Sequence, residues 1–367
     1  MDLNELFVKL GYTNEERDYI VNTYPLTDLK DETLYRKITD IYKVLLDYGY
    51  KKADIIKITM LFPVIYSLAV ENIKQKLDGM ISLGYNKEEV IKMTKLFPSL
   101  FSRSIENIKI QINDMISLGY TKNDILKMTK NSPQIYSYSL ENIKKKIDDM
   151  ILLGYTKEDI IKMTKNCPTI YSHSIENIKQ QIEDLILIGY SKEEVIKITK
   201  NCPQIFGYSL ESMKQKINEM LLLGYKKEEV LKITVLLPTF YGLSIENMKQ
   251  KITDIISLGY SKDKVLNMTI TLPALFGLSI ETIKQKIEFY DYINMHELAV
   301  LDTKNLMQSV SLSYARYMFY SDRNIVITMD NYRKLFINQK EFEKRYGIPK
   351  KELLETYNFG LFWEMKR

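Results

Sequence analysis

Lysine residues recur at a fixed spacing along this 367-residue chain, and they supply the chemistry most available to it. Three sets step by 35 residues along the sequence. The first set comprises Lys57, Lys92, Lys127, Lys162, Lys197 and Lys232; the shorter second set comprises Lys95, Lys130, Lys165 and Lys200; the third comprises Lys74, Lys109, Lys144, Lys179, Lys214, Lys249 and Lys284. Aligned ammonium groups make a ridge of like charge, which a phosphate backbone would neutralise.

A second group of side chains departs from the repeat only in its middle part, roughly residues 119–222. Two residues before a recurrent proline stand Asn131, Asn166 and Asn201; one residue after it stand Gln134, Thr169 and Gln204; five residues after it stand Tyr138, His173 and Tyr208. Amide groups pair with the edges of bases, and aromatic rings stack on them. We therefore expect the middle repeats, with the short lysine set, to form a ligand-contacting centre.

The expected nucleic-acid-binding residues are the cations and polar groups of these repeats, together with two arginines of the C-terminal region. They are Lys92, Lys95, Lys127, Lys130, Asn131, Gln134, Tyr138, Lys162, Lys165, Asn166, His173, Lys197, Lys200, Asn201, Gln204, Tyr208, Arg316 and Arg323. If the centre is special, replacing Lys130, Lys165 and Lys200 by alanine weakens binding more than replacing Lys57, Lys232 and Lys262.

Two structural explanations of the same residues stay open. Glu88 precedes Lys92 by four residues and Glu158 precedes Lys162 by four, which is the spacing of helix-surface pairs worth about 0.2–0.5 kcal/mol. The polar middle repeats are explained equally by drift between duplicated repeats, or by terminal repeats made apolar to pack against caps.

The sequence offers little for other chemistry. Two cysteines and two histidines leave scant material for a zinc site. Cys167 and Cys202 occupy the same position of adjacent repeats and are expected to be small core residues, not a disulfide, because equivalent helices lie roughly 8–10 Å apart. We find no phosphate-binding glycine loop and no nucleophile elbow. We therefore expect a protein that is not an enzyme and that has no cofactor and no metal.

A 35-residue repeat must position these side chains. Its markers are a Gly-Tyr pair, a proline, and a threonine four residues before the proline. The glycines are Gly84, Gly119, Gly154, Gly189, Gly224 and Gly259, and the prolines are Pro63, Pro98, Pro133, Pro168, Pro203, Pro238 and Pro273. Seven repeats are in register. A looser repeat with Gly11-Tyr12 and Pro25 precedes them, as expected of a terminal cap.

Each repeat is predicted to be a pair of helices. Gly84 ends one helix, because glycine enters the left-handed region cheaply, and Asn86 is placed to cap the next. Pro98 stops that helix and opens a short turn. Ser104 then caps a second, amphipathic helix. One pair cannot bury both apolar faces alone, whereas stacked pairs can, so the pattern predicts an α-solenoid.

The predicted fold is therefore all-α: a right- or left-handed α-solenoid of about eight helix pairs with a helical C-terminal cap. We expect a degenerate capping repeat at 1–48, a regular array at 49–290 and a helical tail at 291–367. Hydrophobic residues make up 45% of the chain and charged residues 27%, with a net charge of +5, which suits a soluble monomer and permits polyanion binding. Without a signal or transit peptide in the sequence, and with a lysine-rich, bacterial-like composition, we expect a cytoplasmic location.

The repeat resembles the mitochondrial transcription termination factor (mTERF) family over residues 48–290. That family's motif is a proline followed by leucine-like residues three, ten and seventeen positions later. Here Pro98 is followed by Phe101, Ile108 and Met115; Pro168 by Tyr171, Ile178 and Leu185; Pro203 by Phe206, Met213 and Met220. Two features depart from the family's pattern: the first of these positions is always aromatic, and Arg103 is the only arginine in the regular array.

The resemblance implies two α-helices and a short 3₁₀ turn per repeat, coiled into a superhelix. It also implies binding of nucleic acid, often duplex DNA, along a basic groove in transcription, termination or RNA maturation. We therefore expect a nucleic-acid-binding protein with a lysine-lined groove and a transcription-related or RNA-related role, with duplex DNA preferred over RNA. The alternative is a protein–protein interaction scaffold that presents a concave solenoid surface.

Overall fold

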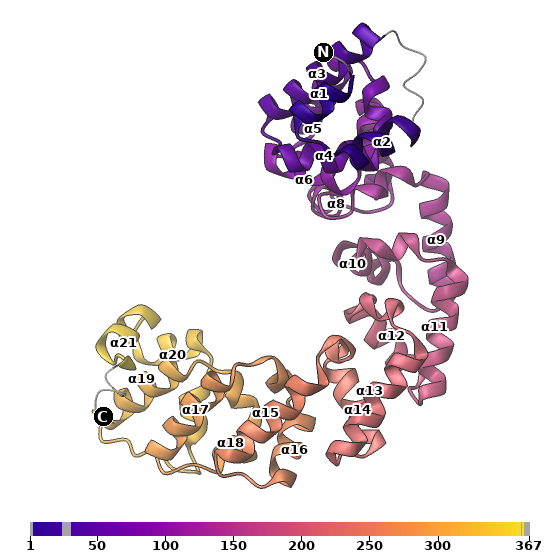
Figure 1. Ribbon diagram of the computed structural model, residues 1–367. Helices are drawn as coiled ribbons and strands as arrows, with labels where there is room; N and C mark the ends of the chain where they lie inside the picture. Colours follow the sequence, from indigo (N-terminus) through magenta and orange to yellow (C-terminus); the bar gives the residue numbers. More distant parts are fainter. Residues whose placement is uncertain (1–2, 24–30, 361, 363–367) are drawn as a thin grey trace. The chain divides into compact units, whose positions relative to one another are not determined.

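The computed structural model describes residues 3–23, 31–360 and 362, and in this part of the chain every regular element is a helix (Figure 1). The all-α prediction is confirmed. The chain divides into two compact units: residues 1–183 with 199–206, and residues 184–198 with 207–367. Pro25, which marks the predicted N-terminal repeat, lies outside the described residues.

Each repeat consists of a first helix, a 3₁₀ turn and a second helix, as Figure 1 shows along both compact units. The first helices are α4 (Lys52–Leu61), α6 (Lys87–Leu96), α8 (Lys122–Thr129), α10 (Lys157–Asn166), α12 (Lys192–Asn201), α14 (Lys227–Leu236) and α16 (Lys262–Thr271). The second helices are α5 (Val70–Leu83), α7 (Ile105–Ser117), α9 (Leu140–Leu152), α11 (Ile175–Ile188), α13 (Leu210–Leu223), α15 (Ile245–Ser257) and α17 (Ile280–Tyr292). The turns are η2 (Pro63–Ser67), η3 (Pro98–Ser102), η4 (Pro133–Ser137), η5 (Pro168–Ser172), η6 (Pro203–Gly207), η7 (Pro238–Gly242) and η8 (Pro273–Gly277).

The predicted caps set the helix boundaries. Gly84 has φ of +116° at the end of α5, a conformation that glycine adopts without strain. Asn86 and Glu89 form a reciprocal capping box at the start of α6, with backbone-to-side-chain bonds of 2.9 and 3.1 Å. Ser104 accepts the amide of Asn107 at 3.0 Å and caps α7. The sequence therefore fixes each helix locally before any packing is considered.

Buried hydroxyl groups connect successive repeats. The Tyr120 hydroxyl lies 2.6 Å from the Thr164 hydroxyl and 2.6 Å from the Tyr171 hydroxyl, and Thr164 donates to the Ile160 carbonyl at 2.8 Å. Because Thr164 donates its hydroxyl proton to a carbonyl, its oxygen can only accept from Tyr120. The Tyr120 proton is then used in that bond, so Tyr171 is the donor to Tyr120. The same Tyr–Thr bond joins Tyr12 to Thr59, Tyr50 to Thr94, Tyr85 to Thr129, Tyr155 to Thr199, Tyr190 to Thr234 and Tyr225 to Thr269.

A second set of hydrogen bonds joins five of the second helices, α7, α9, α13, α15 and α17, to the 3₁₀ turn that follows or to the residue just after it. Gln111 donates its amide at 2.8 Å to the carbonyls of Ile135 and Tyr138, and Lys146 donates to the carbonyl of His173. Lys216, Lys251 and Lys286 donate to the carbonyls of Leu243, Leu278 and Leu306. The sequence analysis missed this column, although it also recurs every 35 residues, because these lysines look like any others on an amphipathic helix.

The two ends of the chain carry further helices. At the N-terminus these are α1 (Leu3–Leu10), α2 (Asn14–Thr23) and α3 (Asp31–Tyr48). At the C-terminus they are α18 (Leu298–Leu301), η9 (Thr303–Met307), α19 (Val310–Ser321), η10 (Tyr332–Phe336), α20 (Gln339–Tyr346) and α21 (Lys350–Thr356). The order helix, 3₁₀ turn, helix thus continues beyond the regular spacing. Within the described residues, no helix combines the length and the apolar character needed to cross a membrane.

Candidate nucleic-acid interface

The first-helix lysine column is exposed and carries unneutralised charge. It comprises Lys57, Lys92, Lys127 and Lys162 in the first compact unit and Lys197 and Lys232 in the second, and all six side chains are exposed. None of the six forms an ion pair with a carboxylate of the described residues, and the helix-surface pairs Glu88–Lys92 and Glu158–Lys162 are not formed there. The structure therefore leaves these ammonium groups exposed and without an ion pair.

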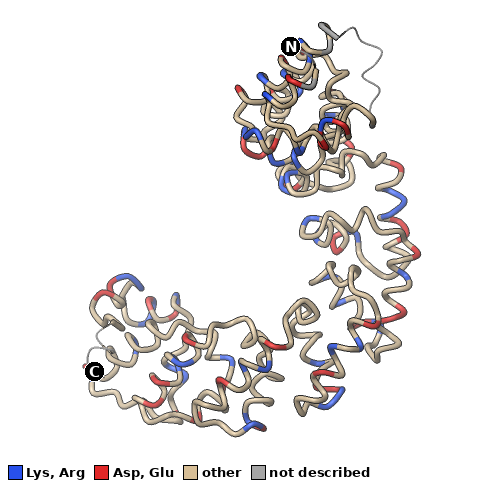
Figure 2. Tube along the Cα trace, in the orientation of Figure 1, with Lys and Arg blue, Asp and Glu red and all other residues tan. Residues whose placement is uncertain are grey.

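Within each compact unit, first helices of successive repeats pack against one another, which brings the lysines they carry into a row. In the first compact unit α4 contacts α6 and α8 contacts α10, and in the second α14 contacts α16. Packed helix axes lie about 8–10 Å apart, close to the rise of three base pairs of duplex DNA. Figure 2 shows that basic and acidic segments alternate along both compact units. The lysines are therefore aligned by the stacking of their helices, and the surrounding surface carries acidic as well as basic residues.

The predicted asparagines lie beside this row, at the ends of the first helices. Lys92 donates from its ammonium group to the Asn131 side-chain oxygen of the following repeat at 2.6 Å. Asn131, Asn166 and Asn201 are all exposed. The structure thus brings Lys92 of the column together with Asn131, one member of the asparagine set predicted for the middle repeats.

The short lysine set has a structural role that the sequence analysis did not consider. Each ammonium group reaches back to the first helix of the preceding repeat and pairs with a carboxylate there. The pairs are Lys95–Asp54 at 2.5 Å, Lys130–Glu89 at 3.1 Å, Lys165–Asp124 at 2.7 Å and Lys200–Asp159 at 3.0 Å. Its part in nucleic-acid binding stays a prediction, because a phosphate would have to compete with a carboxylate already in place.

These carboxylates also cap their own helices, so each pair ties the start of one first helix to the end of the next. The backbone amide of Asn86 and the ammonium of Lys130 hold the pKa of Glu89 below its usual value. Burial by itself would raise the pKa of Asp124, but hydrogen bonds from Lys165 and Thr121 keep it lowered. All four lysines lie in or beside the last turn of a helix, where the helix dipole also favours a cation.

The predicted aromatic set lies against the neighbouring repeat instead of standing free. Tyr138 and Tyr208 are half-buried, with ring centroids 6.4 Å from those of Tyr171 and Tyr241 respectively. His173 is also half-buried, and burial followed by the charge of Lys146 lowers its pKa. In the middle repeats, the predicted asparagines are therefore exposed, whereas the predicted aromatic rings are half-buried.

Of the two remaining predicted amides, Gln204 lies beside a cysteine. Gln134 is half-buried and Gln204 is exposed, and the Gln204 side-chain oxygen lies 3.5 Å from the sulfur of Cys202. Cys167 and Cys202 are buried as free thiols, which agrees with the core role predicted for them.

Arg316 requires a correction. It is only 2% exposed, and it donates to the carbonyls of Leu335 and Ile337 at 2.9 and 2.8 Å, so it continues the column that joins second helices to 3₁₀ turns. A buried guanidinium that satisfies two carbonyls is not placed to bind a phosphate, so the assignment of Arg316 to the interface is wrong. Arg323 is exposed, and its guanidinium lies 3.6 Å from the ring centroid of Phe319.

The described residues contain no group of three or more His, Cys, Asp or Glu side chains that could hold a metal ion. Nearest to such an arrangement is His296, whose Nδ1 lies 2.6 Å from Asp291 and whose ring stacks on Tyr260 at 4.4 Å. A single carboxylate beside one imidazole is too few ligands for a zinc site.

Stacked helix–3₁₀–helix repeats, joined through buried hydroxyl groups, define an α-solenoid, and its exposed first-helix lysines are the candidate site. The mTERF family model matches residues 4–152, 146–247 and 185–301, and the chain belongs to the mTERF family. Among curated proteins, none matches the sequence. Membership indicates a nucleic-acid-binding helical-repeat protein with a transcription-related role, in a family whose members are generally not enzymes.

Proposed function

We propose that this protein binds duplex DNA as a monomer, along the phosphate backbone, through the first-helix lysine column. The observation that carries the proposal is the contrast between two lysine sets on the same helices. The first-helix column has no carboxylate partner among the described residues, whereas the short set is paired throughout. Unpaired ammonium groups are the ones that gain most from displacing condensed counterions on DNA.

The exposed asparagines extend this proposal from affinity to recognition. Asn131 lies within hydrogen-bonding distance of Lys92, so a backbone phosphate held by the lysine would place a groove edge near the amide. Asn side chains offer paired donors and acceptors that match adenine in the major groove. We assign backbone binding to the lysines and base contacts to Asn131, Asn166 and Asn201.

Binding of duplex DNA, single-stranded DNA and RNA, measured by fluorescence anisotropy from about 50 mM salt upward, tests the proposal. Four lysine–phosphate contacts, from the column of the first compact unit, predict that log K falls against log salt with a slope of about −4 for duplex DNA. Duplex DNA is expected to bind more tightly than either single strand. No measurable binding of any of the three at the lowest salt would refute the proposal.

A protein scaffold is the second candidate, and one observation favours it. Leu152, Leu187 and Leu222, at the ends of α9, α11 and α13, are 84%, 68% and 86% exposed. Other second helices carry Ser82, Ser117 and Ser257 at the same position. A single exposed leucine is ordinary, but exposed leucines repeated at one position of successive second helices offer apolar surface to a protein partner. Capture of a partner from lysate with and without nuclease separates the two functions, because a scaffold keeps its partner after nuclease treatment.

A further inference from the structure

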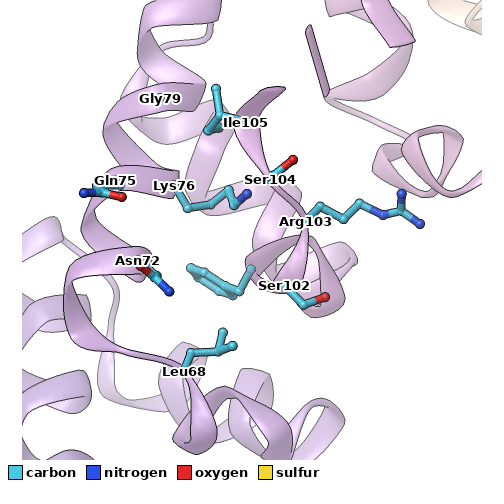
Figure 3. A pocket seen from close by; sticks show the side chains of 10 residues that line it. Leu68, Asn72, Gln75, Lys76, Gly79, Ser102, Arg103, Ser104 and Ile105 are labelled. Carbon is cyan, nitrogen blue, oxygen red and sulfur yellow. The ribbon is translucent and has the colours of Figure 1, made fainter. Parts of the chain in front are cut away.

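A cavity of about 430 Å³ opens between α5 and the segment that joins η3 to α7 (Figure 3). Apolar side chains of Leu68, Phe101 and Ile105 form part of its wall. Cavities of this volume are in the range that holds small organic molecules. It is built by second helices and a 3₁₀ turn, so it uses none of the first-helix lysines proposed to bind DNA.

Lys76 supplies the ammonium group of this cavity. The side chain is only 5% exposed, and it extends from α5 toward the segment that carries Ser104 (Figure 3). Its counterparts Lys146 and Lys216 donate to carbonyls of the following 3₁₀ turn, whereas Lys76 makes no hydrogen bond or ion pair with the described residues. A buried cation without a partner is costly, so the cavity favours an occupant that supplies one.

The carboxylates that accompany this lysine elsewhere are absent from the lining of this cavity. The corresponding cavity of the later repeats is lined by Lys146 together with Asp149 and Glu176, and both acids act on the charge of Lys146. Gly79 stands where Asp149 stands in that repeat. A Cβ atom at Gly79 would come within 2.4 Å of the Ile105 side chain, so the glycine also lets α7 approach α5 closely.

A second cation takes the place of a neutral residue at the rim. Arg103 stands where other repeats have Leu68, Leu243 and Leu278, and it lines the cavity with its side chain directed outward (Figure 3). Burial, followed by the charge of Arg103, lowers the pKa of Lys76 to about 8. Gly79 thus removes a negative charge from this cavity, and Arg103 adds a positive one.

We propose that this cavity binds a small organic anion, with a phosphate or carboxylate head on the Lys76 ammonium and a compact apolar body against Leu68, Phe101 and Ile105. The Ser104 hydroxyl accepts the capping amide of Asn107 and keeps its own proton for the anion. Arg103, directed outward at the rim, adds positive charge at the mouth of the cavity. Lys76 lies on the second helix α5, so this cavity and the first-helix lysine column proposed to bind DNA use separate residues.

Titration of the full chain with phenyl phosphate, benzoate and uncharged benzamide, followed by calorimetry, tests the proposal. Saturable binding of an anion and none of benzamide is expected, and the preferred anion identifies the head group. Lys76→Gln is expected to weaken binding by about tenfold or more, because a charge-assisted hydrogen bond is lost. Arg103→Leu is expected to weaken it less, because only a nearby positive charge is removed. Both replacements already occur at the same position of other repeats, at Gln111 and Leu243, so the fold accepts them.

Lys146→Gln is the matched control, and it is expected to leave anion binding unchanged because Asp149 and Glu176 line its cavity. Two results would overturn the proposal. One is the absence of saturable binding of either anion up to about 10 mM. The other is a Lys76→Gln protein that loses affinity for duplex DNA but not for phenyl phosphate, which would make Lys76 part of the DNA interface.

Discussion

Donor and acceptor are assigned for the buried hydroxyl groups of Tyr120, Thr164 and Tyr171. The effect of removing one hydroxyl oxygen at a time can therefore be predicted. Tyr120 both donates to Thr164 and accepts from Tyr171, whereas Tyr171 only donates to Tyr120. Loss of the central hydroxyl therefore leaves a buried donor without an acceptor. Loss of the outer hydroxyl removes that donor and leaves the remaining bonds intact.

Tyr120→Phe is expected to lower the free energy of unfolding by about 1–3 kcal/mol, the cost of an unsatisfied buried donor, and Tyr171→Phe by about 1 kcal/mol or less. Urea unfolding followed by circular dichroism measures both. Phe101 and Phe206 already stand at the position of Tyr171 in other repeats, which makes the outer change a matched control. Equal effects of the two changes would show that the hydroxyl directions are wrongly assigned.

The same tyrosines predict how stability depends on pH. Burial raises the pKa of Tyr12 and Tyr155 to about 12 from an unfolded value near 10. Above pH 10 the unfolded chain therefore loses protons that the folded chain keeps, so stability falls steeply with rising pH. Buried Lys76 and Lys286, with pKa values lowered to about 8, act in the opposite direction and raise stability between pH 8 and 10.

Urea midpoints measured from pH 7 to pH 11 are expected to rise slightly to about pH 9–10 and to fall beyond it. Tyrosinate absorbance recorded in the same titration is expected to appear together with unfolding. Ionisation of every tyrosine near pH 10 in a fully folded chain, the buried ones included, would contradict the burial of these hydroxyl groups.

At the scale of elements, the helices and their caps could be predicted because each signal is local. Gly84, Asn86 and Ser104 mark helix ends by their own conformation and hydrogen bonds, and the structure places the ends where they indicate. Contacts between repeats could not be predicted. Lys130 pairs with Glu89, 41 residues earlier, a separation that becomes visible only when the first helices are stacked.

For the same reason the candidate site was predicted in part. Exposure of Lys92 and Asn131 follows from their positions on an amphipathic helix, and the two residues do meet. Burial of Arg316 could not be foreseen, because its carbonyl partners belong to a later 3₁₀ turn. The periodic column of Lys146, Gln111 and their counterparts was the available signal, and it was hidden among other lysines.

Ion pairs between first helices carry their own prediction. Asp124→Asn removes the charge that pairs with Lys165 and weakens the cap on Thr121, so it is expected to cost about 1 kcal/mol of unfolding free energy. Glu158→Gln, on the exposed face of α10, is the control and is expected to cost less than about 0.5 kcal/mol. Thermal unfolding compares them. If the Glu158→Gln control is as unstable as Asp124→Asn, the Asp124–Lys165 ion pair makes no specific contribution to stability.

The pair also predicts a pH dependence at the acid end. The pKa of Asp124 is lowered in the folded protein, so its contribution is present above the unfolded value near 4 and is lost as pH falls. The stability difference between Asp124→Asn and the unchanged protein is expected to vanish below about pH 3. A difference that persists there would assign the effect to packing and not to charge.

At the scale of the whole molecule, the central claim is that repetition aligns one set of lysines for an external polyanion while another set holds the repeats together. The two sets lie three residues apart on the same helices, so net charge alone cannot distinguish them. Matched charge removal from each set can. Lys92, Lys127 and Lys162 represent the first-helix lysine column, called the free column below. Lys95, Lys130 and Lys165 represent the short lysine set, called the paired set below.

Duplex DNA affinity as a function of salt, measured for these two triple Lys→Gln proteins, is the most direct test. Removal of the free column is expected to weaken binding by about tenfold or more and to reduce the salt slope by about 3, roughly one per lost phosphate contact. Removal of the paired set is expected to lower stability and to leave the salt slope unchanged. An equal or greater loss of slope from the paired set would contradict the account.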